Sequence, residues 1–195
     1  VATSTDPSDD AVEEWAALRG VDVARGALDD VLGRFVGVVD SHSPDAVVRL
    51  TAACPMLDPQ VIDTAVATWR ANPHLDYVSS ILHRTLPRGL DVEVVAAPAL
   101  RRLDGLATAF HRTHVTSYIY THPEEFDILG LAFSPRADHF RVTLDTPDDA
   151  RMLDALAAGL GDRPPTWREV AGWLASHPDV AALNAEVTQK ALDEG

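Results

Sequence analysis

The stretch Arg49-Leu50-Thr51-Ala52-Ala53-Cys54-Pro55-Met56-Leu57-Asp58-Pro59 joins a predicted strand to a predicted helix. The apolar run from Ala46 to Leu50 has the length of a buried strand, and two prolines end it. A helical pattern then begins at Val61. Ligands of open α/β sheets bind beyond the carboxyl ends of such strands. The stretch therefore predicts a strand whose end forms part of a binding site.

Strand and helix patterns alternate on both sides of this stretch. The spacing of apolar residues predicts helices over 9–18, 27–39, 59–71, 98–110, 113–120, 147–160, 167–175 and 179–192. Alternation and turn residues predict strands over 21–23, 46–51, 76–80, 90–95, 126–133 and 139–144. This order is typical of an α/β fold with a mixed, mostly parallel sheet. We predict one domain over 1–162, with an insertion over 78–133, and a helical appendage over 163–195.

Composition narrows the class of protein. The chain has 195 residues, 46% of them apolar, which is enough for a substantial buried core. Its formal net charge of -14 argues against binding to nucleic acid or to an anionic membrane. No apolar run approaches the ~20 residues of a membrane helix. The single cysteine suits a reducing compartment, so we expect a cytoplasmic protein.

The beginning of the chain is unusual. Residues Val1 to Pro7 resemble the end of a strand followed by a turn, and no initiator methionine precedes them. We therefore expect the chain to begin inside a domain.

Several polar residues have both a functional and a structural interpretation. Asp145 could bind a metal ion, or it could be an acid that commonly precedes a helix N-cap. Asp91 and Glu93 share one face of a predicted strand and could bind hydroxyl groups, or they could form a solvated face. Arg88, next to Gly89, could bind a phosphate or carboxylate with two hydrogen bonds, or it could be a surface turn residue.

Two further features favour structural interpretations. His111 and His114 are three residues apart, as zinc ligands can be, but no second pair of ligands has suitable spacing. Cys54 is better explained as a small buried residue than as a nucleophile, because nothing nearby in the sequence would lower the pKa of its thiol.

The chain resembles the sugar-nucleotide cytidylyltransferases of the spore-coat polysaccharide type, which are relatives of CMP-octulosonate and acylneuraminate synthetases. The matching segments span the chain in order: Val1-Ala2-Thr3-Ser4-Thr5, Arg25-Gly26, Arg49 to Pro55, Arg84 to Glu93, Arg112 to Tyr120, Leu144 to Asp149, and His177 to Ala185. The resemblance implies a Rossmann-like, three-layer nucleotidyltransferase fold. It also implies that CMP is transferred from CTP to a sugar acid or related acceptor, with release of pyrophosphate.

The same resemblance implies roles for individual residues. Asp145 is expected to bind Mg²⁺ and, with Arg88, to act in catalysis; the expected nucleotide-binding residues are Thr3, Ser4, Arg25 and Arg49, and the expected acceptor-binding residues are Asp91, Glu93, Arg112 and His114. A homodimer is also implied.

Two departures from the family pattern put activity in question. The family carries an aspartate that binds magnesium where this chain has Ala53, whose methyl group cannot bind a cation. The glycine-rich phosphate loop and the first strand of the family do not occur in this sequence. We therefore expect weak or no turnover from this chain as given. The alternative is a relative that binds a sugar or nucleotide, or dimerises, without catalysis.

Overall fold

The computed structural model describes residues 1–188, apart from the side chain of Ala109. These residues form two compact units, each built from segments that are separated in the sequence. The first unit consists of residues 1–47 and 95–127, and the second consists of residues 48–94 and the chain from 128 onward.

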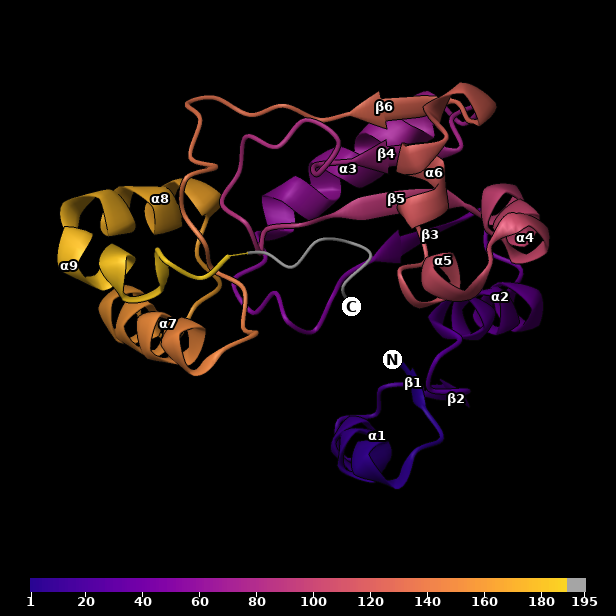
Figure 1. The fold of residues 1–195 in the computed structure, drawn as a ribbon, viewed down its shortest axis with the longest axis horizontal. Helices are drawn as coiled ribbons and strands as arrows, with labels where there is room; N and C mark the ends of the chain where they lie inside the picture. The colour runs from indigo at the N-terminus through magenta and orange to yellow at the C-terminus, as the bar shows by residue number, and fades with distance from the viewer. Residues whose placement is uncertain (189–195) are drawn as a thin grey trace. The chain divides into compact units, whose positions relative to one another are not determined.

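The first unit contains a small parallel sheet and a group of helices (Figure 1). Its elements are β1 (Ala2–Ser4), η1 (Pro7–Asp9), α1 (Asp10–Leu18), β2 (Ala24–Gly26), α2 (Val31–His42), α4 (Ala97–Leu106), α5 (Ala109–Thr113), α6 (Ser117–Thr121) and η2 (Pro123–Glu125). Helix α2 packs against β1, β2, α4 and α5. Its buried residues Leu32 and Val39, with Leu100 and Leu103 of α4, form the core of this unit.

The second unit contains the remaining helices. They are α3 (Pro59–Ala71), α7 (Pro147–Leu160), α8 (Trp167–Ser176), α9 (Pro178–Ala181) and the short η3 (Ala182–Asn184). Helices α7, α8 and α9 pack against one another, and η3 packs against α7 (Figure 1). The core of this unit includes Val61 of α3, Met152 and Leu156 of α7, and Val170 and Leu174 of α8.

A four-stranded sheet has the order β3-β5-β4-β6, with strands β3 (Ala46–Arg49), β4 (Tyr77–Ser79), β5 (Glu93–Ala96) and β6 (Ile128–Gly130). Strands β4 and β6 run parallel, with Val78 opposite Leu129. All residues of β4 and β5 are buried, as expected for the central strands of a sheet that is covered on both faces.

Helix starts follow the local chemistry of the sequence. At α7, the hydroxyl of Thr146 accepts a hydrogen bond from the backbone NH of Asp149, whose carboxylate accepts one from the NH of Thr146, and Pro147 holds the first turn. At α3, Asp58 caps the helix and Pro59 begins it. Both helices span the predicted ranges, 59–71 and 147–160.

Some predicted elements were wrong. The segment 139–144 is not a strand, because it pairs with Arg88 at one position and then turns to pair with Ala53. The strand predicted over 21–23 is found a few residues later, as β2. Val21 is outside it because its NH bonds to the carbonyl of Ala16 at the end of α1. The predicted helix over 179–192 ends at Ala181 and continues as η3, and its last residues lie outside the described chain.

Other boundaries moved by a few residues. The predicted helix 27–39 begins at Val31, because Asp30 caps it, and helix 98–110 is α4 and ends at Leu106. The predicted domain boundary after residue 162 and the insertion over 78–133 stay predictions. Among the described residues, no helix has both the length and the apolar character needed to cross a membrane.

Candidate active site

Backbone hydrogen bonds join three segments of the second unit, one of which lies within the stretch Arg49 to Pro59. The NH of Arg88 donates to the carbonyl of Phe140 at 2.9 Å, and the NH of Val142 donates to the carbonyl of Arg88 at 2.6 Å. The NH of Leu144 donates to the carbonyl of Ala53 at 2.8 Å. We call residues 53–54, 88–91 and 141–145 the three-segment site.

Gly89 allows the second and third segments to approach so closely. Its φ of +100° is a conformation that side chains rarely adopt, and a Cβ atom there would lie 2.6 Å from the backbone nitrogen of Thr143. The glycine that follows Arg88 is therefore required by the geometry of the site.

Asp145 presents its carboxylate at the edge of this site. Its Oδ2 atom accepts hydrogen bonds from Nη2 of Arg141 at 2.7 Å and from the hydroxyl of Thr143 at 3.3 Å. The side chain remains 47% exposed. The hydroxyl of Thr143 also lies 2.9 Å from the carbonyl oxygen of Ala53, so this one side chain contacts both Ala53 and Asp145.

Asp149 is buried directly behind Asp145. It accepts hydrogen bonds from Nε and Nη2 of Arg141 at 2.8 and 2.9 Å, and from the backbone NH groups of Asp145 and Thr146 at 3.1 Å. Burial alone would raise the pKa of this carboxyl, but the hydrogen bonds from Arg141, Asn184 and the backbone hold it well below its usual range. Asp149 is therefore a permanently charged anchor for Arg141.

Arg88 is half-buried. Within residues 1–188, its guanidinium makes no hydrogen bond or ion pair. Burial and the neighbouring cations Arg84 and Arg141 lower the pKa of this side chain. It also lines a cavity of about 150 Å³, together with His139, Arg141 and Asn184. An anion placed there would pair with a guanidinium that has no ion pair within residues 1–188.

Cys54 is buried, as the sequence predicted. Burial raises the pKa of its thiol to about 11, and the negative charges of Asp91 and Asp145 add to this shift. The thiol is therefore protonated at neutral pH and unsuited to act as a nucleophile.

The other predicted residues of the second unit are paired with each other or with close neighbours. Asp91 binds Arg84 through both carboxylate oxygens, at 2.6 and 3.0 Å. Glu93 is 2% exposed and binds Arg49 and the hydroxyl of Tyr77. The solvated strand face that was one interpretation of Glu93 is therefore wrong.

In the first unit, the predicted nucleotide-binding residues Thr3, Ser4 and Arg25 form hydrogen bonds with one another or with nearby residues of the same unit. The hydroxyls of Thr3 and Ser4 donate to Asp9 at 2.7 and 2.6 Å, and these bonds lower the pKa of Asp9 to about 2. Arg25 donates to the carbonyl of Ser4 at 2.6 Å and pairs with Glu13 at 2.6 Å. These bonds link β1 to Asp9, the residue before α1, and link β2 to Glu13 of α1.

Arg112 also has partners inside the first unit. It binds both oxygens of Asp30 at 2.8 and 2.9 Å, and it binds Asp104 at 2.8 Å. These hydrogen bonds raise its pKa above the usual value. His114 follows α5 and precedes Val115, whose φ of +43° is rare for a β-branched residue. The role of Arg112 and His114 in acceptor binding stays a prediction.

Asp145 is the residue of this site that could hold Mg²⁺. No group of three or more His, Cys, Asp or Glu residues within the described chain could hold a metal ion by itself. Mg²⁺ is commonly bound by one or two carboxylates together with substrate phosphates. A Mg²⁺ site at Asp145 would therefore need the phosphates of a bound nucleotide to complete it, and it stays a prediction.

Sequence reasoning missed the roles of Arg141, Asp149 and Asn184. Asp149 entered the sequence analysis only as the last residue of the matching segment Leu144 to Asp149. Its position as the third residue after the Thr146 cap could have indicated a capping carboxylate. No local pattern indicates that Asn184 reaches it from 35 residues away.

Comparisons of the sequence with known proteins find a family model and similar proteins that cover most of the chain. A family model described as cytidylyltransferase matches residues 1–154. The spore coat polysaccharide biosynthesis protein SpsF of Bacillus subtilis is 32% identical over 188 residues, which cover 93% of this chain and 76% of that protein. An uncharacterised protein of Methanocaldococcus jannaschii is 30% identical over 197 residues, which cover 100% of this chain and 79% of that protein.

Solved structures share the fold. A cytidylyltransferase from Leptospira borgpetersenii matches 98% of this chain and 80% of its own, with a TM-score of 0.90 and 24% identity. A CMP:2-keto-3-deoxy-manno-octonic acid synthetase, solved in complex with CTP, matches 80% of this chain and 79% of its own, with a TM-score of 0.60 and 14% identity. These matches confirm the predicted α/β nucleotidyltransferase fold.

Proposed function

The chain belongs to the cytidylyltransferase family, and on this premise we propose that it transfers CMP from CTP to a sugar acid or related acceptor in polysaccharide biosynthesis. The convergence of Ala53, Arg88 and Asp145 in the three-segment site is the observation that carries the proposal. The relative from Bacillus subtilis, named for polysaccharide biosynthesis, supports the proposed pathway class.

In the proposed reaction, an acceptor hydroxyl oxygen attacks the α-phosphorus of CTP. A new P–O bond forms, the bond between the α-phosphorus and the bridging oxygen breaks, and pyrophosphate leaves with that electron pair. The hydroxyl proton passes to solvent. The residues contribute by holding the two substrates in line for this attack.

Arg88 binds an anionic oxygen of a substrate in this scheme. Its half-buried guanidinium has the geometry for two parallel hydrogen bonds to a phosphate or carboxylate, and the described residues leave these donors unused. Arg141 cannot serve in the same way, because Asp145 and Asp149 already bind it.

In this proposal Asp145 would hold Mg²⁺ beside the phosphates of CTP. When bound, this ion would neutralise negative charge at the α-phosphate. Ala53 supplies a backbone carbonyl but no carboxylate, and that carbonyl already accepts two hydrogen bonds, from Thr143 and Leu144. The chain therefore holds Mg²⁺ weakly and turns over slowly. The homodimer implied by the resemblance stays a prediction.

The test is pyrophosphate release from CTP in the presence of a panel of sugar acids, with ATP, GTP and UTP as comparison nucleotides. We expect slow release that depends on CTP, Mg²⁺ and one class of acceptor. Asp145→Ala should reduce the rate about 100-fold. Asp148→Ala is the matched control, because Asp148 is a neighbouring acid whose ion pair within residues 1–188 is an exposed one with Arg151.

Two results would contradict the proposal. One is release that is unaffected by Asp145→Ala. The other is the absence of CTP-dependent release and of calorimetric CTP binding over the whole range of Mg²⁺ concentrations.

A further inference from the structure

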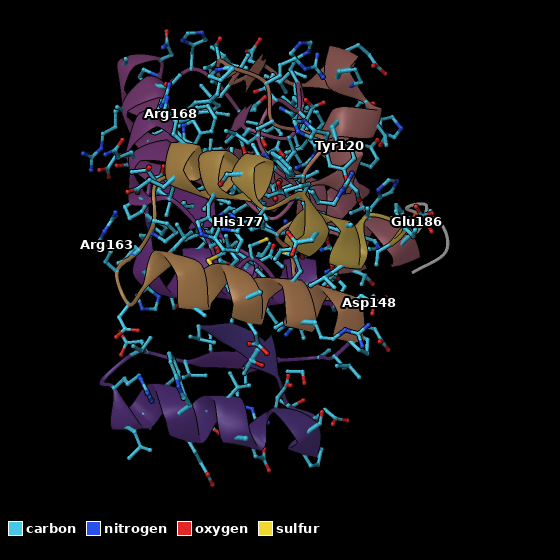
Figure 2. All side chains as sticks on the ribbon, turned by 90° about the vertical axis from the view of Figure 1, so that its left-hand side faces the viewer. Tyr120, Asp148, Arg163, Arg168, His177 and Glu186 are labelled. Carbon is cyan, nitrogen blue, oxygen red and sulfur yellow. The ribbon has the colours of Figure 1, made fainter. Side chains whose placement is uncertain are left out.

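The C-terminal segment contacts the three-segment site through one buried side chain. Asn184 in η3 is 3% exposed. Its Nδ2 atom donates to Oδ1 of Asp149 at 2.8 Å and to the carbonyl oxygen of Arg141 at 3.2 Å. Figure 2 shows the segment that carries Glu186 beside the end of α7 where Asp148 lies, while Arg163 lies at the opposite end. One amide thus bonds to both members of the pair behind Asp145.

The contacts form a continuous chain from η3 to the carboxylate that is proposed to hold Mg²⁺. Asn184 bonds to Asp149, Asp149 holds two nitrogens of Arg141, and Nη2 of Arg141 reaches Asp145 at 2.7 Å. Asp149 is fully buried, and the side chain of Arg141 is only 10% exposed. Because the buried Asp149 holds two nitrogens of Arg141, the guanidinium has little freedom to turn away from Asp145.

The amide of Asn184 supplies an uncharged hydrogen-bond donor to Asp149. Both oxygens of Asp149 accept hydrogen bonds from Arg141, and the uncharged amide of Asn184 adds one more without bringing a second cation to the carboxylate. The second bond from Asn184, to the Arg141 carbonyl, fixes the backbone from which the guanidinium extends.

We propose that Asn184 is a positioning residue for CMP transfer, which acts through Asp149 and Arg141 to orient Asp145 toward Mg²⁺ and the phosphates of CTP. This inference rests on the proposed function. It makes the C-terminal segment part of the catalytic apparatus, although this segment lies beyond residues 1–154, which the family model matches.

The test compares Asn184→Ala with Val170→Ala. Val170 is a fully buried core residue of α8 and makes no hydrogen bond through its side chain, so its truncation weakens the C-terminal helices without touching the chain of contacts. Mg²⁺-dependent binding of CTP is measured by calorimetry at a temperature at which thermal unfolding shows each variant to be folded. We expect Asn184→Ala to raise the half-saturating Mg²⁺ concentration about tenfold, whereas Val170→Ala leaves it unchanged.

A second readout does not require any ligand. The Nε–H group of Arg141 should give a slowly exchanging NMR signal in the parent protein, because Asp149 binds it. This signal should exchange faster in Asn184→Ala and be unchanged in Val170→Ala. If Asn184→Ala does not fold, Asn184→Ser, whose hydroxyl can still donate one hydrogen bond, replaces it.

The outcomes separate this inference from the proposed function. Parent-like Mg²⁺ dependence and Arg141 exchange in Asn184→Ala would overturn the positioning role and leave the proposed function intact. Equal shifts in Asn184→Ala and Val170→Ala would assign Asn184 to stability alone. Absence of Mg²⁺-dependent CTP binding by the parent protein itself would overturn both.

Discussion

The two compact units use their predicted site residues in different ways. In the first unit, Thr3, Ser4, Arg25 and Arg112 all bind groups of the same unit. In the second unit, Asp145 keeps a carboxylate that is 47% exposed, and the guanidinium of Arg88 binds no partner within the described residues. Paired side chains stabilise the fold, and Arg49, Asp91 and Glu93 of the second unit are also paired. Arg88 has donors that the described residues leave unused, and Asp145 keeps an exposed carboxylate beside its pair with Arg141. We therefore propose that the second unit carries the chemistry.

The largest effect is expected where the second unit anchors its site. Asp149→Ala removes the buried partner of Arg141 and should lower the free energy of unfolding by about 3–5 kcal/mol. Urea denaturation measures this change. Asp148→Ala is the control, with an expected change below about 1 kcal/mol, because its pair with Arg151 is exposed. Equal effects at the two positions would contradict the difference in burial.

A smaller effect is expected from the arginine that joins segments of the first unit. Arg112→Ala removes the partner of Asp30 and Asp104, and because these groups are partly exposed it should cost about 1–2 kcal/mol of stability. Arg101→Ala, which loses an exposed pair with Asp40 and a long hydrogen bond to the carbonyl of Val39, is the matched control and should cost less than about 1 kcal/mol. If Arg112→Ala instead raised the KM for the acceptor and left stability unchanged, the first unit would also contain site residues.

The first unit should also lose stability in acid through Asp9. The pKa of its carboxyl is about 2 in the folded protein and about 4 in an unfolded chain, so its contribution is complete above about pH 4 and is lost as the pH falls toward 2. Asp9→Asn should remove this part of the pH dependence, as measured by urea midpoints between pH 2 and 6. An unchanged profile would mean that Thr3 and Ser4 do not hold this carboxylate.

The smallest effect on stability is expected at Arg88. Arg88→Ala should change the free energy of unfolding by less than about 0.5 kcal/mol, because no ion pair of the described residues is lost. Added pyrophosphate should raise the thermal unfolding temperature of the parent protein, and Arg88→Ala should abolish this increase. Arg84→Ala, which leaves Asp91 without its partner, should be less stable than Arg88→Ala. The reverse order would show that Arg88 is structural.

Much of the fold could be predicted because its signals are local. Asp58 followed by Pro59, and Thr146 followed by Pro147, begin α3 and α7 at the predicted residues. The resemblance to the cytidylyltransferase family is confirmed by the family match over residues 1–154. The sequence drew attention to Arg88 beside Gly89, but not to the close approach of Thr143 to that glycine, and the role of Asp145 stays a prediction.

The rest depends on contacts between distant residues. Arg112 and Asp30 are 82 residues apart, and Asn184 and Asp149 are 35 apart, so no periodicity reveals either pair. Glu93 alternates with apolar residues as a surface residue would, but its strand β5 lies between β3 and β4 and is buried. Segment 139–144 has the composition of a strand, yet it divides its hydrogen bonds between Arg88 and Ala53.

The most direct test of the account restores the missing carboxylate. Pyrophosphate release from CTP is measured against Mg²⁺ concentration for the parent chain and for Ala53→Asp, with the selected sugar-acid acceptor present. If Asp145 and position 53 face one ion, Ala53→Asp should lower the half-saturating Mg²⁺ concentration about tenfold and raise the rate. Superimposable Mg²⁺ curves for the two proteins would contradict the assignment of this site.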